Sequence, residues 1–271
     1  MIFITGDIHG DTRNVVRFVH KMNLTFEDVI ILLGDVGANY YRNERDEMVK
    51  SRLNRLGPTF LCVHGNHEIR PANIPSYKLK DWRGGRVWVE DKYPSLLFAK
   101  DGEIFDLDGQ KCLVIGGAYS VDRAYRLARG YGWWPDEQPS EIIKRYAESR
   151  IDEEHIDIVL SHTCPFRLEP VEAFLPMIDQ KDIDSSTELW LDMIEERLLA
   201  QGYKAWYCGH WHIDKHTERL HFLYRTFETI GEGKDPEKND GREHAGSHVF
   251  DEIKAGLQQA IEYEKGNRGK T

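Results

Sequence analysis

The stretch FITGDIHGD, residues 3–11, decides how the rest of the chain is interpreted. The apolar residues 2–4 predict a short buried strand, and Gly6 and Gly10 flank a turn that carries Asp7 and His9. A turn that caps the next helix would use these residue types, and so would one half of a metal site. Because Asp-x-His is a common tripeptide, the choice between the two depends on the rest of the sequence.

Further apolar stretches are short and continuous rather than alternating, which is typical of strands buried on both faces. They cover residues 29–33, 60–63, 112–115, 156–160 and 205–208. We expect helices between several of them: one with Asp11 as its N-cap, and others over 44–56, 140–149 and 187–201. A strand-rich segment at 86–118 and a late one at 221–229 favour two sheets with outer helices over one doubly wound sheet.

The bulk composition is that of a globular protein, with 40% hydrophobic and 30% charged residues in a chain of 271. A net charge of −10 argues against a general binder of nucleic acid or of membrane surfaces. The N-terminus lacks the features of a signal peptide, and no apolar stretch approaches the ~20 residues that span a bilayer. We interpret the four cysteines as reduced and buried, and expect a cytoplasmic protein. They are Cys62, Cys112, Cys164 and Cys208.

Polar side chains follow five of the predicted strands, at the point where each strand ends. They are Asp7 and His9, Asp35, Asn66 and His67, His162, and His210 and His212. The carboxyl ends of parallel strands lie along one edge of a sheet, so residues far apart in sequence can converge there. Any one of these motifs alone is better explained as a turn with capping side chains. Five in this order, each after an apolar stretch, favour one shared site.

These donors outnumber the ligands of a single tetrahedral zinc ion. Oxygen and imidazole donors without thiolate favour Mn²⁺, Fe, Zn²⁺ or Mg²⁺ in five- or six-coordinate sites. A single aspartate that bridges two metals would account for the number of donors. Two metals about 3.5–4 Å apart clamp the attacking and leaving oxygens of an in-line displacement, and a water held between them becomes the nucleophile.

The motifs GDIH, GD, GNHE, SH and GHWH occur in this order over residues 2–229, and the set resembles the calcineurin-like metallophosphoesterase superfamily. The resemblance implies an α/β fold, namely a four-layer α-β-β-α sandwich of two mixed β-sheets flanked by helices. It also implies a dinuclear centre at the strand ends. The implied cofactors are two divalent metal ions, with manganese preferred and iron, zinc, nickel or magnesium as alternatives.

The resemblance implies a role for each residue of the set. The ligands of the first metal would be Asp7, His9 and His212. The ligands of the second would be Asn66, His162 and His210. Asp35 would bridge the two metals. His67 resembles the residue that contacts phosphate and protonates the leaving group, a role that suits an imidazole because its pKa lies near the operating pH.

The chain departs from the protein Ser/Thr phosphatase branch, which GDIHG and GNHE resemble. The second motif of that branch is GDxxDRG, whose later Asp pairs with the catalytic His and whose Arg holds phosphate. Ala38 and Asn39 stand at those positions, which argues against protein phosphatase activity and leaves another group to hold the phosphate. We expect the arginine- and tryptophan-rich segment 116–140 to border the site, with Arg123 as a phosphate ligand. The alternative is a solvated arginine-rich helix above packed tryptophans.

The function expected from these motifs is that of a metal-dependent phosphoesterase in which a metal-bridging hydroxide attacks phosphorus, with phosphomonoesters as preferred substrates. The alternative is a phosphodiesterase or nuclease acting on nucleotides or nucleic acid, which the arginine- and tryptophan-rich segment favours. A third reading is a non-catalytic, metal-bound scaffold that binds a protein partner, but the complete ligand set argues against it. The expected partner is therefore a small phosphate ester or a nucleotide.

The composition of the chain changes after Ile230. We therefore place the metallophosphoesterase catalytic domain at residues 1–230 and a polar linker with a C-terminal amphipathic helix at 231–271. Apolar residues at helical spacing in that last segment predict a helix that packs on the domain or on a second copy of the chain. A homo-oligomer formed through this helix is the corresponding expectation.

Overall fold

The computed structural model describes residues 1–175 and 180–230. The linker and C-terminal helix expected over 231–271, and the homo-oligomer expected from them, lie outside these residues. None of the helices in the described part of the chain combines the length and the apolar character needed to cross a bilayer.

The first sheet is mixed and has seven strands. In spatial order they are β13 (Glu228–Thr229), β1 (Ile2–Thr5), β2 (Val29–Leu32), β3 (Thr59–Cys62), β6 (Leu96–Ala99), β5 (Gly85–Glu90) and β4 (Tyr77–Trp82). The four strands from β1 to β6 are parallel, and β13, β5 and β4 run antiparallel to their neighbours. The parallel centre of this sheet therefore places the carboxyl ends of β1, β2 and β3 at one edge.

The second sheet is also mixed and has six strands. In spatial order they are β11 (Lys215–His216), β12 (Leu220–Phe222), β10 (Ala205–Cys208), β9 (Ile158–Ser161), β8 (Gln110–Ile115) and β7 (Ile104–Leu107). Its four central strands are parallel, and β11 and β7 are antiparallel to their neighbours. The strand-rich segment 86–118 thus divides between the sheets, because β5 and β6 join the first sheet whereas β7 and β8 join the second.

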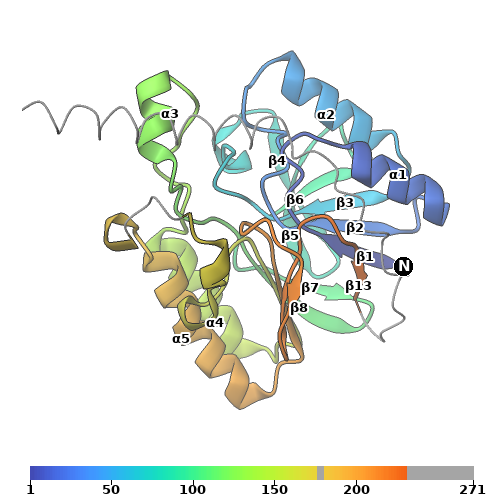
Figure 1. Ribbon diagram of the computed structural model, residues 1–271. Helices are drawn as coiled ribbons and strands as arrows, with labels where there is room; N and C mark the ends of the chain where they lie inside the picture. The colour runs from blue at the N-terminus through green and yellow to red at the C-terminus, as the bar shows by residue number, and fades with distance from the viewer. Residues whose placement is uncertain (176–179, 231–271) are drawn as a thin grey trace, which may run out of the picture.

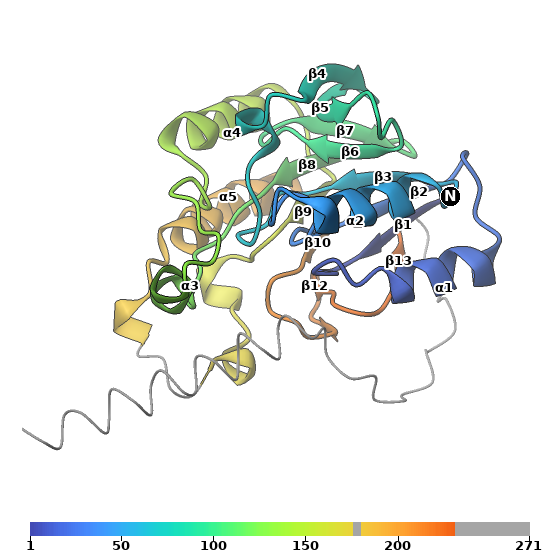
Figure 2. The ribbon, with the colours of Figure 1, turned by 90° about the horizontal axis from the view of Figure 1, so that it is seen from above.

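Helices cover the outer faces of both sheets. α1 (Arg13–Met22) and α2 (Glu44–Asn54) pack on the first sheet, and α4 (Glu141–Glu153) and α5 (Ser186–Gln201) pack on the second (Figure 1). Short 3₁₀ turns lie at Pro71–Asn73, Phe166–Leu168, Val171–Ala173 and Gln180–Asp182. α3 (Arg123–Arg129) lies outside these layers in both views (Figure 1 and Figure 2). The four-layer sandwich predicted from the sequence is confirmed.

Each strand sends alternate side chains to different cores, which explains why the strands are apolar throughout. In β1, Ile2 and Ile4 contribute to the core between the two sheets, whereas Phe3 packs in the core under α1 and α2. In β10, Tyr207 contributes to the core between the sheets and Trp206 to the core under α4 and α5. Burial on both faces fixes the register of these strands, because a slip by one residue would exchange the two sets of side chains.

The helix ends differ slightly from the sequence prediction. α1 begins at Arg13 with Thr12 at its N-cap, and Asp11 is one residue too early for that position. The Asp11 carboxylate nevertheless accepts a hydrogen bond from the Arg13 backbone N–H at 3.1 Å, so it still satisfies a donor of the first turn. α4 extends four residues beyond the predicted 140–149, with the Ser140 side chain as its N-cap.

Candidate metal centre and active site

The structure brings the predicted metal ligands together beyond the ends of five strands. The loops after β1, β2 and β3 supply Asp7, His9, Asp35 and Asn66, and those after β9 and β10 supply His162, His210 and His212. The first sheet therefore provides four of these residues and the second sheet three. Because the two sheets pack face to face, the loops meet at one edge of the sandwich.

One half of the set is a cluster of one carboxylate and two imidazoles. His212 Nε2 lies 3.1 Å from Asp7 Oδ2 and 2.9 Å from His9 Nε2. His9 Nε2 is in turn 3.8 Å from the same Asp7 oxygen. Ligand atoms held about 2.1 Å from one metal lie roughly 3 Å apart at right angles and roughly 4.2 Å apart on opposite sides, so this spacing fits a single divalent ion.

The other half converges on the Asn66 side chain. Asn66 Oδ1 lies 2.8 Å from His162 Nε2 and 3.1 Å from His210 Nδ1. Asp35 lies between the two clusters, with Oδ1 at 3.7 Å from His162 Nε2 and Oδ2 at 3.8 Å from His9 Nε2. The two carboxylate oxygens of Asp35 thus face different clusters, an arrangement that allows this carboxylate to bridge two metals.

Neighbouring groups orient the ligand atoms before any metal binds. His162 Nδ1 lies 2.7 Å from the Leu33 carbonyl oxygen, to which only a protonated nitrogen can donate, so Nε2 is left for the metal. The Asn66 Nδ2 donates to Ser120 Oγ at 2.9 Å, which turns Oδ1 toward the histidines. The backbone N–H groups of His210 and His67 donate to Asp7 Oδ1 and Asp35 Oδ1, at 2.9 Å and 2.8 Å.

The backbone around the ligands adopts conformations that most residues avoid. Four of the eight non-glycine residues with positive φ in the described part of the chain belong to the ligand set: His9, Asp35, His210 and His212. Such conformations cluster at functional sites, where the surrounding structure holds them in place. Gly65 and Gly209 allow close approach, because a Cβ there would lie 2.0 Å from Asp35 Oδ1 and 2.2 Å from Asp7 Oδ1.

Burial and repulsion by neighbouring imidazoles favour the neutral form of His9 and His210. Burial lowers the pKa of His210 to about 3, and the nearby His162 adds to this effect. Burial also lowers the pKa of His9, although Asp35 partly opposes it. For Asp7 burial alone would raise the pKa, but His162 and His212 bring it below its usual range. Neutral imidazoles and ionised carboxylates are the protonation states that bind metal ions.

His67 lies beside this cluster together with a buried ion pair from the segment before and within α3. Its Nε2 is 3.8 Å from Asp122 Oδ1, and its ring stacks near that of Tyr40. Asp122 lies 3.6 Å from Arg126 Nη1, and the Arg126 side chain is fully buried. Burial lowers the pKa of His67 well below its ordinary value, and the positive charge of Arg126 contributes to this shift.

Arg126 rather than Arg123 is the arginine of this segment that reaches the site. Arg123 is exposed, and its guanidinium stacks on the Trp133 ring at 4.1 Å from the ring centroid. Arg126 Nη1 donates to Ser120 Oγ at 2.8 Å, and that hydroxyl also accepts from the metal-ligand candidate Asn66. The expectation that this segment borders the site is thereby met, but the choice of Arg123 within it is not supported by the placement.

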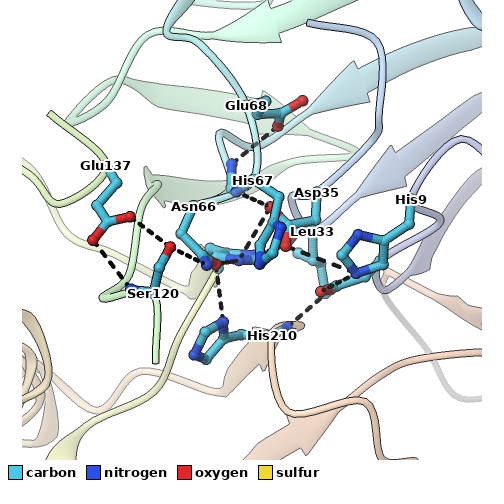
Figure 3. A network of polar contacts seen from close by, with 12 residues as sticks. His9, Leu33, Asp35, Asn66, His67, Glu68, Ser120, Glu137 and His210 are labelled. Atoms are coloured by element: carbon cyan, nitrogen blue, oxygen red, sulfur yellow. Dashed lines mark hydrogen bonds and ion pairs between the residues drawn. The ribbon is translucent and has the colours of Figure 1, made fainter. Parts of the chain in front are cut away.

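The Ser120 hydroxyl and the Glu137 carboxylate hold the Asn66 side chain in place, and neither residue was predicted as part of the site. Ser120 Oγ accepts a hydrogen bond from Asn66 and donates to Glu137 Oε2 at 2.5 Å (Figure 3). The same hydroxyl also accepts from Arg126. Glu137 also accepts from the Ser120 backbone N–H at 3.1 Å and from Trp133 Nε1 at 2.8 Å. Neither residue belongs to a motif, and a serine and a glutamate 17 positions apart carry no sequence signal of their contact.

One comparison with known proteins, the match to a family model, agrees with this geometry. The calcineurin-like phosphoesterase family model matches residues 1–214. No curated protein matches the chain. Among solved structures, a protein of unknown function from Aquifex aeolicus, AQ665, is similar at 15% sequence identity and a TM-score of 0.32, covering 62% of this chain and 81% of that one. With the family model matching most of its length and the donors of its motifs gathered at one edge, the chain belongs to the calcineurin-like phosphoesterase family.

Proposed function

We propose that the protein is a metal-dependent phosphomonoesterase with a dinuclear centre. The observation that carries this proposal is the placement of Asp35 between two clusters of donors, with one carboxylate oxygen facing each. The two clusters contain only oxygen and imidazole donors, a set that suits manganese and its neighbours in the first transition row. Family membership supports phosphoester hydrolysis, and the pairing of the clusters supports two metals rather than one.

When bound, the metals would neutralise charge on the phosphate and lower the pKa of a coordinated water. The chain itself would supply the proton at the leaving oxygen from His67. A dianionic ester beside His67 stabilises the protonated imidazole, which counteracts the lowering of its pKa by burial. Asp122, 3.8 Å from His67 Nε2, would orient that ring and stabilise its positive charge.

Arg126 would hold the phosphate in place of the arginine that this chain lacks at Asn39. Its Nη2 is buried without a hydrogen-bond partner among the described residues, although Nη1 and Nε are bonded to Ser120 Oγ and to the Gly132 carbonyl. Leaving a buried guanidinium N–H unpaired is costly, and a phosphate oxygen would satisfy it. The control for a substitution of Arg126 is Arg123→Gln, which changes an exposed arginine of the same helix.

The proposal is tested with the metal-loaded full chain on p-nitrophenyl phosphate and bis(p-nitrophenyl) phosphate, together with the metal content by elemental analysis. We expect about two metals per chain and faster turnover of the monoester. Faster turnover of the diester would replace the monoesterase proposal by a phosphodiesterase. Two bound metals with no turnover of either ester would point to a scaffold, and a single bound metal would overturn the dinuclear centre.

A further inference from the structure

A cavity of about 340 Å³ adjoins the metal centre on the side of α2. His9 and His67 form the wall that it shares with the centre, and Tyr40, Tyr41, Arg45 and Arg52 are among the residues that line it further out. Its volume lies within the range of small-molecule sites. Because the cavity starts at His67, which we place next to the leaving oxygen, it is positioned to receive the leaving group of the substrate.

One face of α2 lines this cavity. The face consists of Arg45, Met48, Val49 and Arg52, which follow the i, i+3, i+4, i+7 spacing of one side of a helix. The adjoining side of α2 packs on the protein through Asp46, Lys50 and Leu53. The cavity face therefore has an apolar centre and a guanidinium at each end, about 10 Å apart along the axis.

The charge of this cavity is opposite to that of the chain as a whole. None of the described residues that line it is acidic, although the chain carries a net charge of −10. Neither Arg45 nor Arg52 forms an ion pair within residues 1–175 and 180–230, whereas Lys50 on the same helix and Arg126 on α3 both do. Two unneutralised arginines that share a cavity are a site for an anion.

The walls of the same cavity are suited to a flat ring. The Tyr40 and Tyr41 rings meet edge to face with centroids 4.7 Å apart, and Tyr40 lies within 24° of parallel to His67. The Arg45 guanidinium lies 4.8 Å from the centroid of the Tyr41 ring. Met48 adds an exposed thioether side chain to this apolar surface. Aromatic, guanidinium and thioether groups all bind the face of a planar ring favourably.

We infer that this cavity binds the organic part of the substrate, and that the substrate is a nucleotide with at least two phosphates. The terminal phosphate would lie at the metal centre, where water would cleave its phosphoanhydride bond and His67 would protonate the departing oxygen of the next phosphate. That next phosphate would bind Arg45 and Arg52, and the base would stack on Tyr40, Tyr41 and Met48. Stacking on these side chains tolerates any base, so the cavity selects the nucleotide class rather than one nucleobase. The inference rests on the proposed function, since it names the substrate of the same centre.

The test is the binding of a nucleotide that cannot be hydrolysed, adenosine 5′-(α,β-methylene)diphosphate, to the metal-loaded full chain by calorimetry. Adenosine, which lacks phosphate, and methylenediphosphonate, which lacks the ring, are the matched ligands. We expect the nucleotide to bind at least tenfold more tightly than either. Equal affinity for methylenediphosphonate would overturn the role of the ring, and equal affinity for adenosine would overturn that of the arginines.

Three variants locate the binding. The double variant Arg45→Gln/Arg52→Gln should weaken nucleotide binding at least tenfold. The variant Tyr41→Leu should weaken binding of the nucleotide but not binding of methylenediphosphonate. Arg55→Gln, which removes an exposed arginine just beyond α2 and outside the cavity, is the control and should leave binding within twofold. If the combined variant binds like the control, the assignment of the cavity is wrong.

Assays of hydrolysis distinguish a failure of this inference from a failure of the proposed function. Turnover of p-nitrophenyl phosphate without selective binding of the nucleotide would leave the phosphomonoesterase standing and remove the nucleotide as its substrate. Tight nucleotide binding that depends on Arg45 and Arg52, with no turnover of any ester, would keep the nucleotide site and remove the enzyme. For nucleoside diphosphates we expect the Arg45/Arg52 variant to raise KM more than it lowers kcat.

Discussion

Asp122 is the residue whose placement is hardest to explain by stability alone. It is 3% exposed, and neither of its carboxylate oxygens has a hydrogen-bond partner among the described residues. Burial raises its pKa to about 6, even though Arg126 partly offsets this. Buried charge without hydrogen bonds destabilises a fold, and such groups are retained where they act on a reaction.

Asp122→Asn should therefore make the protein more stable and less active. The pKa of Asp122 is higher in the folded chain than in the unfolded chain, so stability falls as pH rises from about 4 through about 6. Asparagine removes that loss, and we expect a gain of about 2 kcal/mol at pH 8 by chemical denaturation in the presence of a chelator. Turnover of p-nitrophenyl phosphate should fall about 10–100-fold. A variant that gains stability and keeps full activity would show that Asp122 does not assist His67.

Asp35→Ala should abolish binding of both metals, whereas His212→Ala should remove only one. The reason is that Asp35 faces both clusters and His212 lies in one. Elemental analysis of the purified chains measures this directly, and activity should fall at least ~10³-fold in both. His155→Ala, which changes an exposed histidine outside the site, is the control. Retention of one metal by Asp35→Ala would mean that this carboxylate serves a single ion.

The ligands could be predicted from the sequence, but their supporting residues could not. Each ligand follows a buried strand directly, and parallel strands bring such positions to one edge whatever their separation in the chain. Asp122 and Arg126 follow no such rule, because a long connection after β8 returns them to His67. Arg123 and Arg126 are three residues apart on α3, and only the docking of that helix decides which of them is buried.

At the scale of elements, α2 packs on the first sheet with one side and lines the proposed nucleotide cavity with another. Its inner side is held by the buried pair of Lys50 Nζ and Glu90 Oε2, 2.6 Å apart, which joins α2 to β5. Its first turn is capped by Asn43, whose side chain accepts from the Arg45 backbone N–H at 2.9 Å. The cap therefore stabilises the same turn that carries a proposed phosphate ligand.

Asn43→Ala should destabilise the protein by about 1 kcal/mol, because the first turn loses the acceptor for one of its N–H groups. The same change should weaken nucleotide binding more than it lowers turnover of p-nitrophenyl phosphate, since Arg45 lies on the loosened turn. Thermal unfolding and calorimetry measure the two effects. Asn43→Ser, which retains a capping oxygen, is the matched variant and should restore most of both. Equal losses in the serine and alanine variants would contradict the capping argument.

The positions of the buried strands β1, β2, β3, β8, β9 and β10 were predictable to within about two residues, because these strands are apolar and end at a glycine or a polar residue. β4, whose side chains are mostly exposed, lay outside the predicted strands. The division of residues 86–118 between the two sheets could not be predicted from the sequence. β5, β6, β7 and β8 all read as apolar strands, and nothing local in them tells which sheet they will join. That choice is made by long-range pairing, of β6 with β3 and of β8 with β9.

At the scale of the whole molecule, the candidate metal ligands come from both sheets. Asp7, His9 and Asn66 come from one sheet and His162, His210 and His212 from the other, and Asp35 lies near residues of both. Each of the two proposed metals would therefore be held by residues from both sheets. Metal binding should consequently stabilise the packing of one sheet on the other as well as the loops themselves.

Addition of Mn²⁺ should raise the melting temperature of the metal-free chain, by an amount that grows with the logarithm of the metal concentration. At a concentration about 100 times the dissociation constant the expected stabilisation is about 2.7 kcal/mol per site. Differential scanning calorimetry across a titration checks this dependence. Asp35→Ala should show a much smaller shift, and the same shift in both proteins would place the stabilising metal elsewhere.

The division of ligands between the sheets also makes the centre a reporter of assembly. Neither sheet alone carries a full coordination sphere, so a metal with a visible spectrum, such as Co²⁺, would acquire its final colour only when the two sheets have docked. In a refolding experiment that colour would time the joining of the halves separately from the formation of their secondary structure. The bound metal would then report when the two sheets dock in the last step of folding, without any probe being introduced into the chain.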